Sequence, residues 1–150
     1  MLDTLAKVAP VEMARGNRDW SFIGKGGWVN RLELAGVSVA LMHGHGSWTN
    51  YIFDKFRYMS QGYRIERYIP LLKRAAKGAR VIVFGHTHHA EIIWDEGQLL
   101  FNPGSAGCGI YQGRKPSWGI LDIFSDGKVA AKIIPLEGFL LVKGQWIPRV

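Results

Sequence analysis

The chain carries the stretch Val81-Ile82-Val83-Phe84-Gly85-His86-Thr87-His88 near its middle. Four consecutive apolar residues are typical of a short strand that is buried on both faces of a sheet. The glycine that follows allows the backbone to turn tightly. We therefore predict a buried strand over residues 81–84 whose carboxyl end presents His86 and His88.

A second histidine pair follows another predicted strand. Two β-rich runs, residues 31–34 and 37–42, flank the short turn Ala35-Gly36 and predict a hairpin. The second run leads into His43 and His45, so the five histidines of the chain lie in two clusters, each after a strand and beside glycine. Open α/β sheets bind ligands at the carboxyl ends of their strands, and imidazole suits Zn, Mn, Fe, Co and Ni. The clusters therefore predict a metal site.

The remaining pattern predicts helices in the middle and hairpins towards the C-terminus. Apolar residues at helical spacing between residues 49 and 78 predict two helices. Pro70 makes the second helix begin late or kink, and Gly78 is expected to end it. Further strands are predicted in antiparallel pairs over residues 91–94 and 98–101, 118–124 and 129–134, and 139–142 and 145–147. We predict a layered α/β fold, with one domain over residues 1–150.

Composition limits the class of protein. Hydrophobic residues make up 47% of the chain and charged residues 21%, as in ordinary globular domains. No apolar run approaches the roughly 18 residues of a membrane-spanning helix, and residues 1–10 carry no targeting pattern. The single cysteine, Cys108, fits a reducing compartment. We expect a cytoplasmic protein without membrane association, with most of its six tryptophans and five tyrosines in the core.

Lysine and arginine total 19 against 12 acidic residues, a formal charge of +7 that favours phosphate-bearing partners. The second predicted helix is strongly basic. A solvated helix face, with lysine stems covering apolar residues, is the favoured interpretation, and a nucleic-acid groove is the alternative. The basic residues are Arg64, Arg67, Lys73, Arg74, Lys77 and Arg80.

Two further segments carry polar groups in short loops. Residues 15–19, Arg-Gly-Asn-Arg-Asp, offer a carboxamide, a guanidinium and a carboxylate within three positions. Residues 102–107, Asn-Pro-Gly-Ser-Ala-Gly, form a loop whose backbone could line a pocket, although these residue types are common in loops.

Four motifs together carry a resemblance to a known family. They are Gly16-Asn17-Arg18-Asp19, His43-Gly44-His45, Gly85-His86-Thr87-His88 and Asn102-Pro103-Gly104-Ser105. In order and spacing they resemble those of the calcineurin-like metallophosphoesterases, most of all the small YfcE-type phosphodiesterases and a related retromer subunit. The resemblance runs from Ala14 to about Pro135. It implies a metallophosphoesterase-like β-sandwich flanked by helices, in which two metals activate a hydroxide that hydrolyses phosphodiesters or phosphomonoesters.

The resemblance also implies residue roles. Asn17, His43 and His86 would bind one metal, and His88 would bind the other. Manganese is the expected metal, with Zn, Fe, Ni, Co and Mg as alternatives.

The residue after Asn17 departs from the pattern. Many family members have histidine there as the acid that protonates the leaving group, followed by a carboxylate. Here Arg18 and Asp19 occupy these catalytic positions, and arginine stays protonated, so it cannot act as a general acid. We expect Arg18 to bind the substrate phosphate, with a simple ion pair to Asp19 as the alternative.

His45 and His89 lie beside the proposed ligands in the sequence. They would contact substrate or lie as solvated loop residues, and His45 is kept as a substrate-binding candidate.

The family's N-terminal strands, which end in Asp-x-His and Gly-Asp, have no counterpart before Asn17, and residues 1–11 instead predict a helix. We therefore expect the N-terminal strands to be missing, so that the chain is the C-terminal portion of the family domain and holds at most one metal. A misassigned start, a truncated gene or an expressed C-terminal part would explain this, and a second polypeptide that supplies the strands is less favoured.

Loss of the N-terminal strands is expected to leave residues 81–84 partly uncovered.

Two function classes follow. The first is a metal-dependent phosphoesterase acting on small phosphoesters, with nucleic acid as a less favoured substrate and the activity of this chain left open. The alternative is a catalytically inactive scaffold that binds proteins, as in the retromer relative. A homo-oligomer is compatible with both, and the sequence specifies neither the natural substrate nor the oligomeric state.

Overall fold

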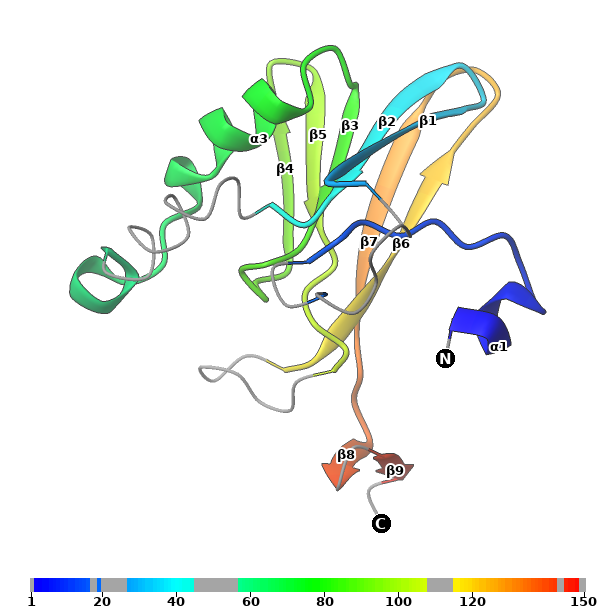
Figure 1. The fold of residues 1–150 in the computed structure, drawn as a ribbon, viewed down its shortest axis with the longest axis vertical. Coiled ribbons are helices and arrows are strands. Elements are labelled where there is room, and N and C mark those ends of the chain that lie inside the picture. The colour runs from blue at the N-terminus through cyan, green and yellow to red at the C-terminus, as the bar shows by residue number, and fades with distance from the viewer. Residues whose placement is uncertain are drawn as a thin grey trace.

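A central mixed sheet organises the chain (Figure 1). The computed structural model describes residues 2–16, 19, 27–44, 57–107, 115–142 and 145–148. The sheet has the order β1-β2-β3-β5-β4. Its strands are β1 (Val29–Leu34), β2 (Val37–Met42), β3 (Val81–Phe84), β4 (Glu91–Asp95) and β5 (Gln98–Asn102). Strands β2, β3 and β5 run parallel, so their carboxyl ends lie side by side at one edge of the sheet.

A helical crossover joins the parallel strands β2 and β3. It contains helical residues 57–61, the 3-10 turn η1 (Ile65–Arg67) and helix α3 (Ile69–Ala75), while residues 49–56 of the expected helices lie outside the described residues. Pro70 stands in the first turn of α3, where its missing N–H leaves no intrahelical hydrogen bond unmade. The helix therefore begins late rather than kinking.

Antiparallel hairpins form the rest of the fold. Strands β6 (Ser117–Ile123) and β7 (Val129–Pro135) pair with each other, as do β8 (Phe139–Val142) and β9 (Gln145–Pro148). Helix α1 (Leu2–Ala6) is shorter than the helix expected over residues 1–11. None of the helices in the described ranges is long and apolar enough to cross a membrane.

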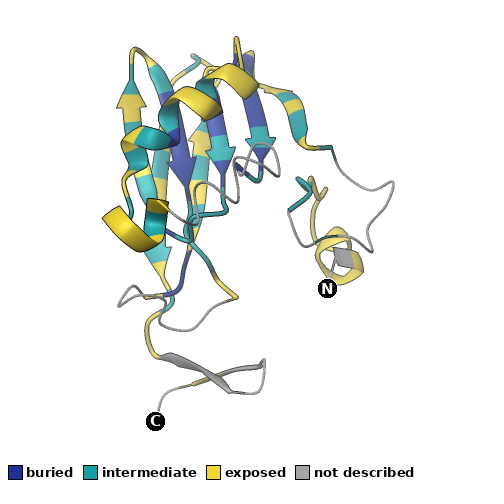
Figure 2. Ribbon diagram, turned by 60° about the vertical axis from the view of Figure 1, so that its left-hand side comes forward, coloured by how far each residue is buried: buried dark blue, intermediate teal, exposed yellow. Residues whose placement is uncertain are grey.

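The core has two layers, one on each face of the central sheet (Figure 2). On one face Leu72 and Ala76 pack with Ile82 and Phe84 of β3. On the other face Val81 and its neighbours pack against the β6–β7 hairpin. This layered α/β sandwich confirms the predicted fold class.

The expectation that residues 81–84 would be partly uncovered is wrong for three of the four residues. Val81 and Ile82 are 0% exposed and Phe84 is 2% exposed, while Val83 is half-buried. Strands β2 and β5 pair with both edges of β3, and the two core layers cover both faces of that strand. A strand in this position keeps most of its apolar surface out of water.

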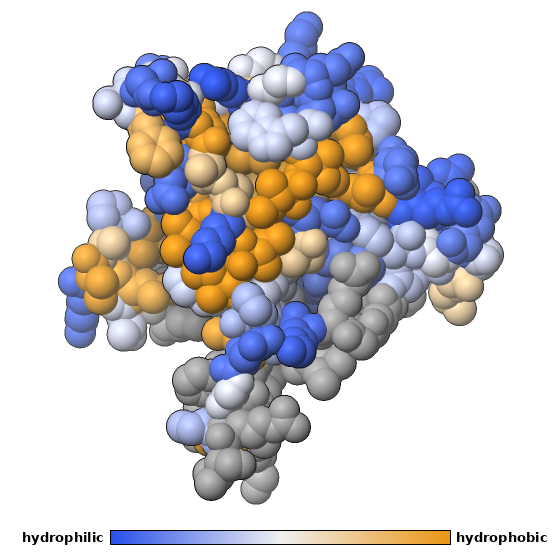
Figure 3. Space-filling view, turned by 180° about the vertical axis from the view of Figure 1, so that it is seen from behind, coloured by the Kyte–Doolittle hydropathy of each residue, from blue (hydrophilic) through white to orange (hydrophobic). Residues whose placement is uncertain are grey.

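Apolar exposure occurs elsewhere, and the expectation of mostly buried tryptophans is not met. Trp28, Trp94 and Trp118 are 53%, 51% and 45% exposed. Seen from behind, apolar side chains form a broad area on the surface (Figure 3). Trp118 and Ile120 alternate along β6 with residues that face the core, so they lie on the outer face of the hairpin.

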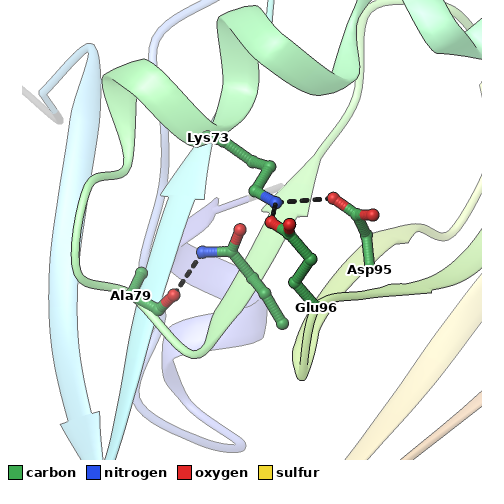
Figure 4. A network of polar contacts seen from close by, with 5 residues as sticks. Lys73, Ala79, Asp95 and Glu96 are labelled. Atoms are coloured by element: carbon green, nitrogen blue, oxygen red, sulfur yellow. Dashed lines mark hydrogen bonds and ion pairs between the residues drawn. The ribbon is translucent and has the colours of Figure 1, made fainter.

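Helix α3 is fastened to the turn between β4 and β5 (Figure 4). The Nζ atom of Lys73 lies 2.6 Å from a carboxylate oxygen of Asp95 and 2.6 Å from one of Glu96. Hydrogen bonds to these carboxylates, Asp95 first, raise the pKa of Lys73. In the same region the Gln98 side chain donates to the Ala79 carbonyl. At least one residue of the basic helix therefore has a structural role.

Candidate metal centre

The ends of three parallel strands are tied together at one edge of the sheet. The backbone N–H of Gly85, after β3, donates to the carbonyl of His43, after β2, over 3.1 Å. The carbonyl of Gly85 accepts a hydrogen bond of 3.1 Å from Nδ2 of Asn102, at the end of β5. Backbone and side-chain bonds thus hold the two histidine clusters in register.

His43 and His86 meet at this edge although 43 positions separate them. Nε2 of His43 lies 3.3 Å from Nδ1 of His86, and the rings form an edge-to-face pair with centroids 5.1 Å apart. Two ring nitrogens this close share either a proton or a cation. Nitrogens that bind one tetrahedral zinc at about 2.1 Å lie roughly 3.3–3.4 Å from each other. The pair therefore fits two ligand positions of one metal.

The turn after β3 has an uncommon backbone. His86 has φ of 68° and His88 has φ of 58°, in the left-handed region that residues with a Cβ seldom adopt. The N–H of Thr87 donates to the Gly85 carbonyl over 2.8 Å, a three-residue turn with His86 at its centre. This turn points Nδ1 of His86 towards His43.

The loop that begins at Gly16 lies against His43. A Cβ atom at Gly16 would lie 3.4 Å from the His43 ring, an ordinary van der Waals distance, and a tighter 3.0 Å from Oδ2 of Asp19. The N–H of Gly16 donates to Oδ2 of Asp19 over 2.7 Å, and the N–H of Asp19 reaches the Gly16 carbonyl over 3.3 Å. Asp19 thus closes a turn beside His43. Three further candidates, Asn17, Arg18 and His45, lie outside the described residues.

Asn30 of β1 fastens this N-terminal segment to the sheet. Its Nδ2 donates to the carbonyl of Met13 over 2.6 Å, and its Oδ1 accepts the N–H of Gly27 over 2.8 Å. The N–H of Arg15 also donates to the Gly27 carbonyl over 3.0 Å. The sequence analysis missed Asn30, because an asparagine at the start of a strand gives no signal of a contact 17 positions away.

His89 is buried, so its interpretation as a solvated loop residue is wrong. It is 3% exposed, and its ring lies over that of Tyr63 with a centroid distance of 3.6 Å. Tyr63 also lines an open hollow of about 370 Å³, together with Arg64, Ile65, Glu66 and Glu91. The buried His89 ring therefore contacts one wall residue of this hollow.

The part of the chain that the structure describes supplies an incomplete donor set. No three of its His, Cys, Asp and Glu side chains come together as metal ligands, His88 included. His88 is half-buried and lies two residues beyond His86. A cation at the histidine pair would need further ligands from Asn17, water or substrate.

Solved structures with a similar fold include three proteins from different organisms. Vps29 from Entamoeba histolytica, solved with zinc, is 21% identical with a TM-score of 0.59, covering 89% of this chain and 74% of that one. Vacuolar Protein Sorting 29 from Cryptosporidium parvum is 18% identical with a TM-score of 0.55, covering 89% and 73%. Vps29 from Chaetomium thermophilum is 14% identical with a TM-score of 0.59, covering 89% and 72%. At these identities the likeness shows the fold.

Sequence comparison identifies the family. No curated protein matches the sequence. The family model of the calcineurin-like phosphoesterase superfamily domain matches residues 1–126, which include the histidine pair and the Gly16–Asp19 turn. The chain therefore belongs to the calcineurin-like phosphoesterase superfamily.

Proposed function

We propose that this chain forms the histidine-bearing part of a metal-dependent phosphoesterase that hydrolyses phosphodiesters or phosphomonoesters. The observation that carries the proposal is the 3.3 Å approach of His43 Nε2 to His86 Nδ1. Two half-buried imidazoles at the carboxyl edge of a parallel sheet are suited to a divalent cation. Membership of the phosphoesterase superfamily supports the same chemistry.

Each residue has a distinct role in this proposal. His43 and His86 hold the cation, and Asn17 adds a carboxamide oxygen to it. Asp19 shapes the loop against His43 through its bond to Gly16. Arg18 binds the substrate through two non-bridging phosphoryl oxygens. A divalent cation at this place polarises the phosphoryl group and lowers the pKa of the attacking water.

Manganese is the first metal to test, and His88 is assigned to a second cation, for which the described residues offer no further His, Cys, Asp or Glu cluster. The Entamoeba histolytica relative was solved with zinc, so zinc is the second choice. The excess of positive charge favours an anionic substrate. Small phosphoesters in the cytoplasm remain the proposed substrates.

The test combines metal content with turnover on one sample. The purified chain is analysed for bound metal and assayed on bis-p-nitrophenyl phosphate with Mn²⁺, together with His43→Ala, His86→Ala and the control Ser117→Ala. We expect one weakly bound metal, which both histidine variants lose and the control keeps. Two metals with fast turnover would mean that ligands come from another chain. A wild type that binds no Mn²⁺ or Zn²⁺ would refute the proposal.

A second candidate function, a protein-binding scaffold, is favoured by the exposed outer face of β6. Trp118 and Ile120 are 45% and 37% exposed there, and the similar structures include vacuolar sorting proteins. Under this candidate the face mediates association and the histidines are dispensable. Sedimentation velocity of wild type, Trp118→Ser and His86→Ala tests self-association. Self-association that is lost only in Trp118→Ser supports this function. A wild type that stays monomeric at all concentrations rules out a scaffold that acts through self-association.

A further inference from the structure

We propose that Asn102 is a positioning residue, whose side-chain amide locks the turn that aims His86 at His43. The expected effect of Asn102 on metal binding rests on the proposed function. The locking of the turn is argued only from contacts within the chain. Asn102 is the first residue of the Asn102-Pro103-Gly104-Ser105 motif, to which the sequence assigned no role for this side chain.

The amide group of Asn102 bridges the two residues that flank His86. Nδ2 donates to the Gly85 carbonyl over 3.1 Å and to Oγ1 of Thr87 over 2.9 Å. Both hydrogens of the amide are therefore used, one on each side of His86. Asn102 itself is 0% exposed, so water cannot replace either bond without opening the core.

The third polar contact fixes the orientation of the amide. Oδ1 of Asn102 accepts the N–H of Gly104 over 3.0 Å, which places Nδ2 on the side of the histidine turn. The end of β5 lies beside the end of β3, with Val83 opposite Phe101, so the amide reaches the turn directly. All hydrogen-bonding groups of this side chain have partners.

The histidine turn needs such a clamp because its backbone is not one that histidine prefers. Positive φ at both His86 and His88 is disfavoured by contacts of their Cβ atoms. The turn itself has a single short backbone bond, from Thr87 N–H to the Gly85 carbonyl. Asn102 ties Gly85 and Thr87 to a buried strand. It therefore favours this conformation of the turn over conformations in which His86 has a negative φ.

Oγ1 of Thr87 extends the clamp to the buried histidine. It accepts the N–H of His89 over 3.3 Å in addition to the Asn102 amide. Thr87 stands between His86 and His88 in the sequence. Its hydroxyl oxygen accepts hydrogen bonds from both the Asn102 amide and the His89 N–H. We expect the two side chains to act together, so that their effects are not additive.

The variants separate the clamp from a general loss of stability. Asn102→Asp keeps the acceptor for Gly104 but replaces the donor with a carboxylate oxygen that faces the Gly85 carbonyl. Thr87→Val removes the hydroxyl and keeps the shape, and Thr87→Ser restores the hydroxyl. Ser117→Ala is the control for loss of a neighbouring bond: it removes the part-buried hydrogen bond to the Pro103 carbonyl and leaves every bond of Asn102 and Thr87 to the histidine turn in place.

The first readout uses metal-free protein. Amide hydrogen exchange measured by NMR reports on Thr87 and Gly85, together with the imidazole ¹⁵N shifts of His43 and His86. We expect faster exchange at Thr87 and altered His86 shifts in Asn102→Asp and Thr87→Val, with Thr87→Ser and Ser117→Ala close to wild type. Unchanged exchange and shifts in both disruptive variants would overturn the proposal.

The second readout is Co²⁺ binding by titration calorimetry and visible absorption. Loss of a group that orients a metal ligand costs about 10–100-fold in affinity. We expect this loss in Asn102→Asp, a smaller loss in Thr87→Val and recovery in Thr87→Ser. If wild type binds no Co²⁺ while the NMR differences persist, the proposed function fails and the clamp stands. Should Asn102→Asp not fold, Thr87→Val and Thr87→Ser decide the outcome.

Discussion

Gly119 of β6 lies directly over the ring of Phe101 of β5, so close that a methyl group on the glycine would overlap the ring. The same methyl group would come within 3.0 Å of Pro103. This contact joins the two sheets of the sandwich at the end nearest Asn102. It explains why a glycine stands within strand β6, since close approach of another backbone or ring is a recurrent use of glycine in strands.

Gly119→Ala should therefore destabilise the fold. Overpacking of this kind costs about 1–3 kcal/mol in the free energy of unfolding, and urea denaturation followed by tryptophan fluorescence measures it. Gly107→Ala is the control, because a Cβ there meets nothing within 4 Å. Equal stability of the two variants would show that the sheets separate easily at this point.

Lys73 should contribute stability that depends on alkaline pH. Its bonds to Asp95 and Glu96 hold its pKa above the usual 10.5, so the contribution is fully present below pH 10.5. It is lost as the pH rises through the folded-state pKa. Lys73→Met should lower the melting temperature at pH 8, and its difference from wild type should shrink above pH 10.5. A Lys73→Met difference that stays constant from pH 8 to above pH 10.5 would contradict the assignment.

Asp19 should affect metal binding through the loop at His43. Asp19→Ala removes the acceptor for the Gly16 N–H, whereas Asp19→Asn retains an oxygen at that position. We expect about 10-fold weaker Mn²⁺ binding in Asp19→Ala and a smaller change in Asp19→Asn. The measurement is calorimetric titration. An effect of asparagine as large as that of alanine would instead indicate that the charge of Asp19 matters, because both variants remove it.

Arg18 should act on substrate rather than on metal. Loss of a charged hydrogen bond, about 1.5–3 kcal/mol, predicts a KM increase of roughly 10–100-fold for Arg18→Ala in a preparation that turns over bis-p-nitrophenyl phosphate. Arg18→Lys should be intermediate, since lysine lacks the bidentate fork. Unchanged KM and kcat in Arg18→Ala would leave only the ion pair with Asp19.

Most of the fold could be predicted because hydrophobic period and turn residues specify it locally. The hairpin around Ala35-Gly36 and the strand at residues 81–84 were found in this way. The burial of β3 could not be predicted, because it depends on which strands pair across the sheet. Exposure of Trp94 and Trp118 likewise reflects where the hairpins leave surface open, which composition does not encode.

The site could be predicted in part. Clustering after glycine-flanked strands indicated that His43 and His86 would meet, and the structure places their nitrogens 3.3 Å apart. Their role as metal ligands stays a prediction. The roles of Asn30 and Asn102 needed three-dimensional contacts, because each acts on residues far along the chain. An asparagine at a strand end next to a metal motif is the signal that could have pointed to Asn102.

The parallel strands also place the histidines and two tight turns at opposite edges of the sheet. The tight turns Ala35-Gly36 and Glu96-Gly97 are exposed and lie at the start of β2 and β5, opposite the histidines. A six-residue strand such as β2 spans about 20 Å. Fluorophores, affinity handles or short inserted peptides attached at the Ala35-Gly36 turn would report on the protein from the edge opposite the histidines, whereas the Glu96-Gly97 turn also carries the ion pair of Glu96 with Lys73. The same edge is the natural place to graft it onto a surface.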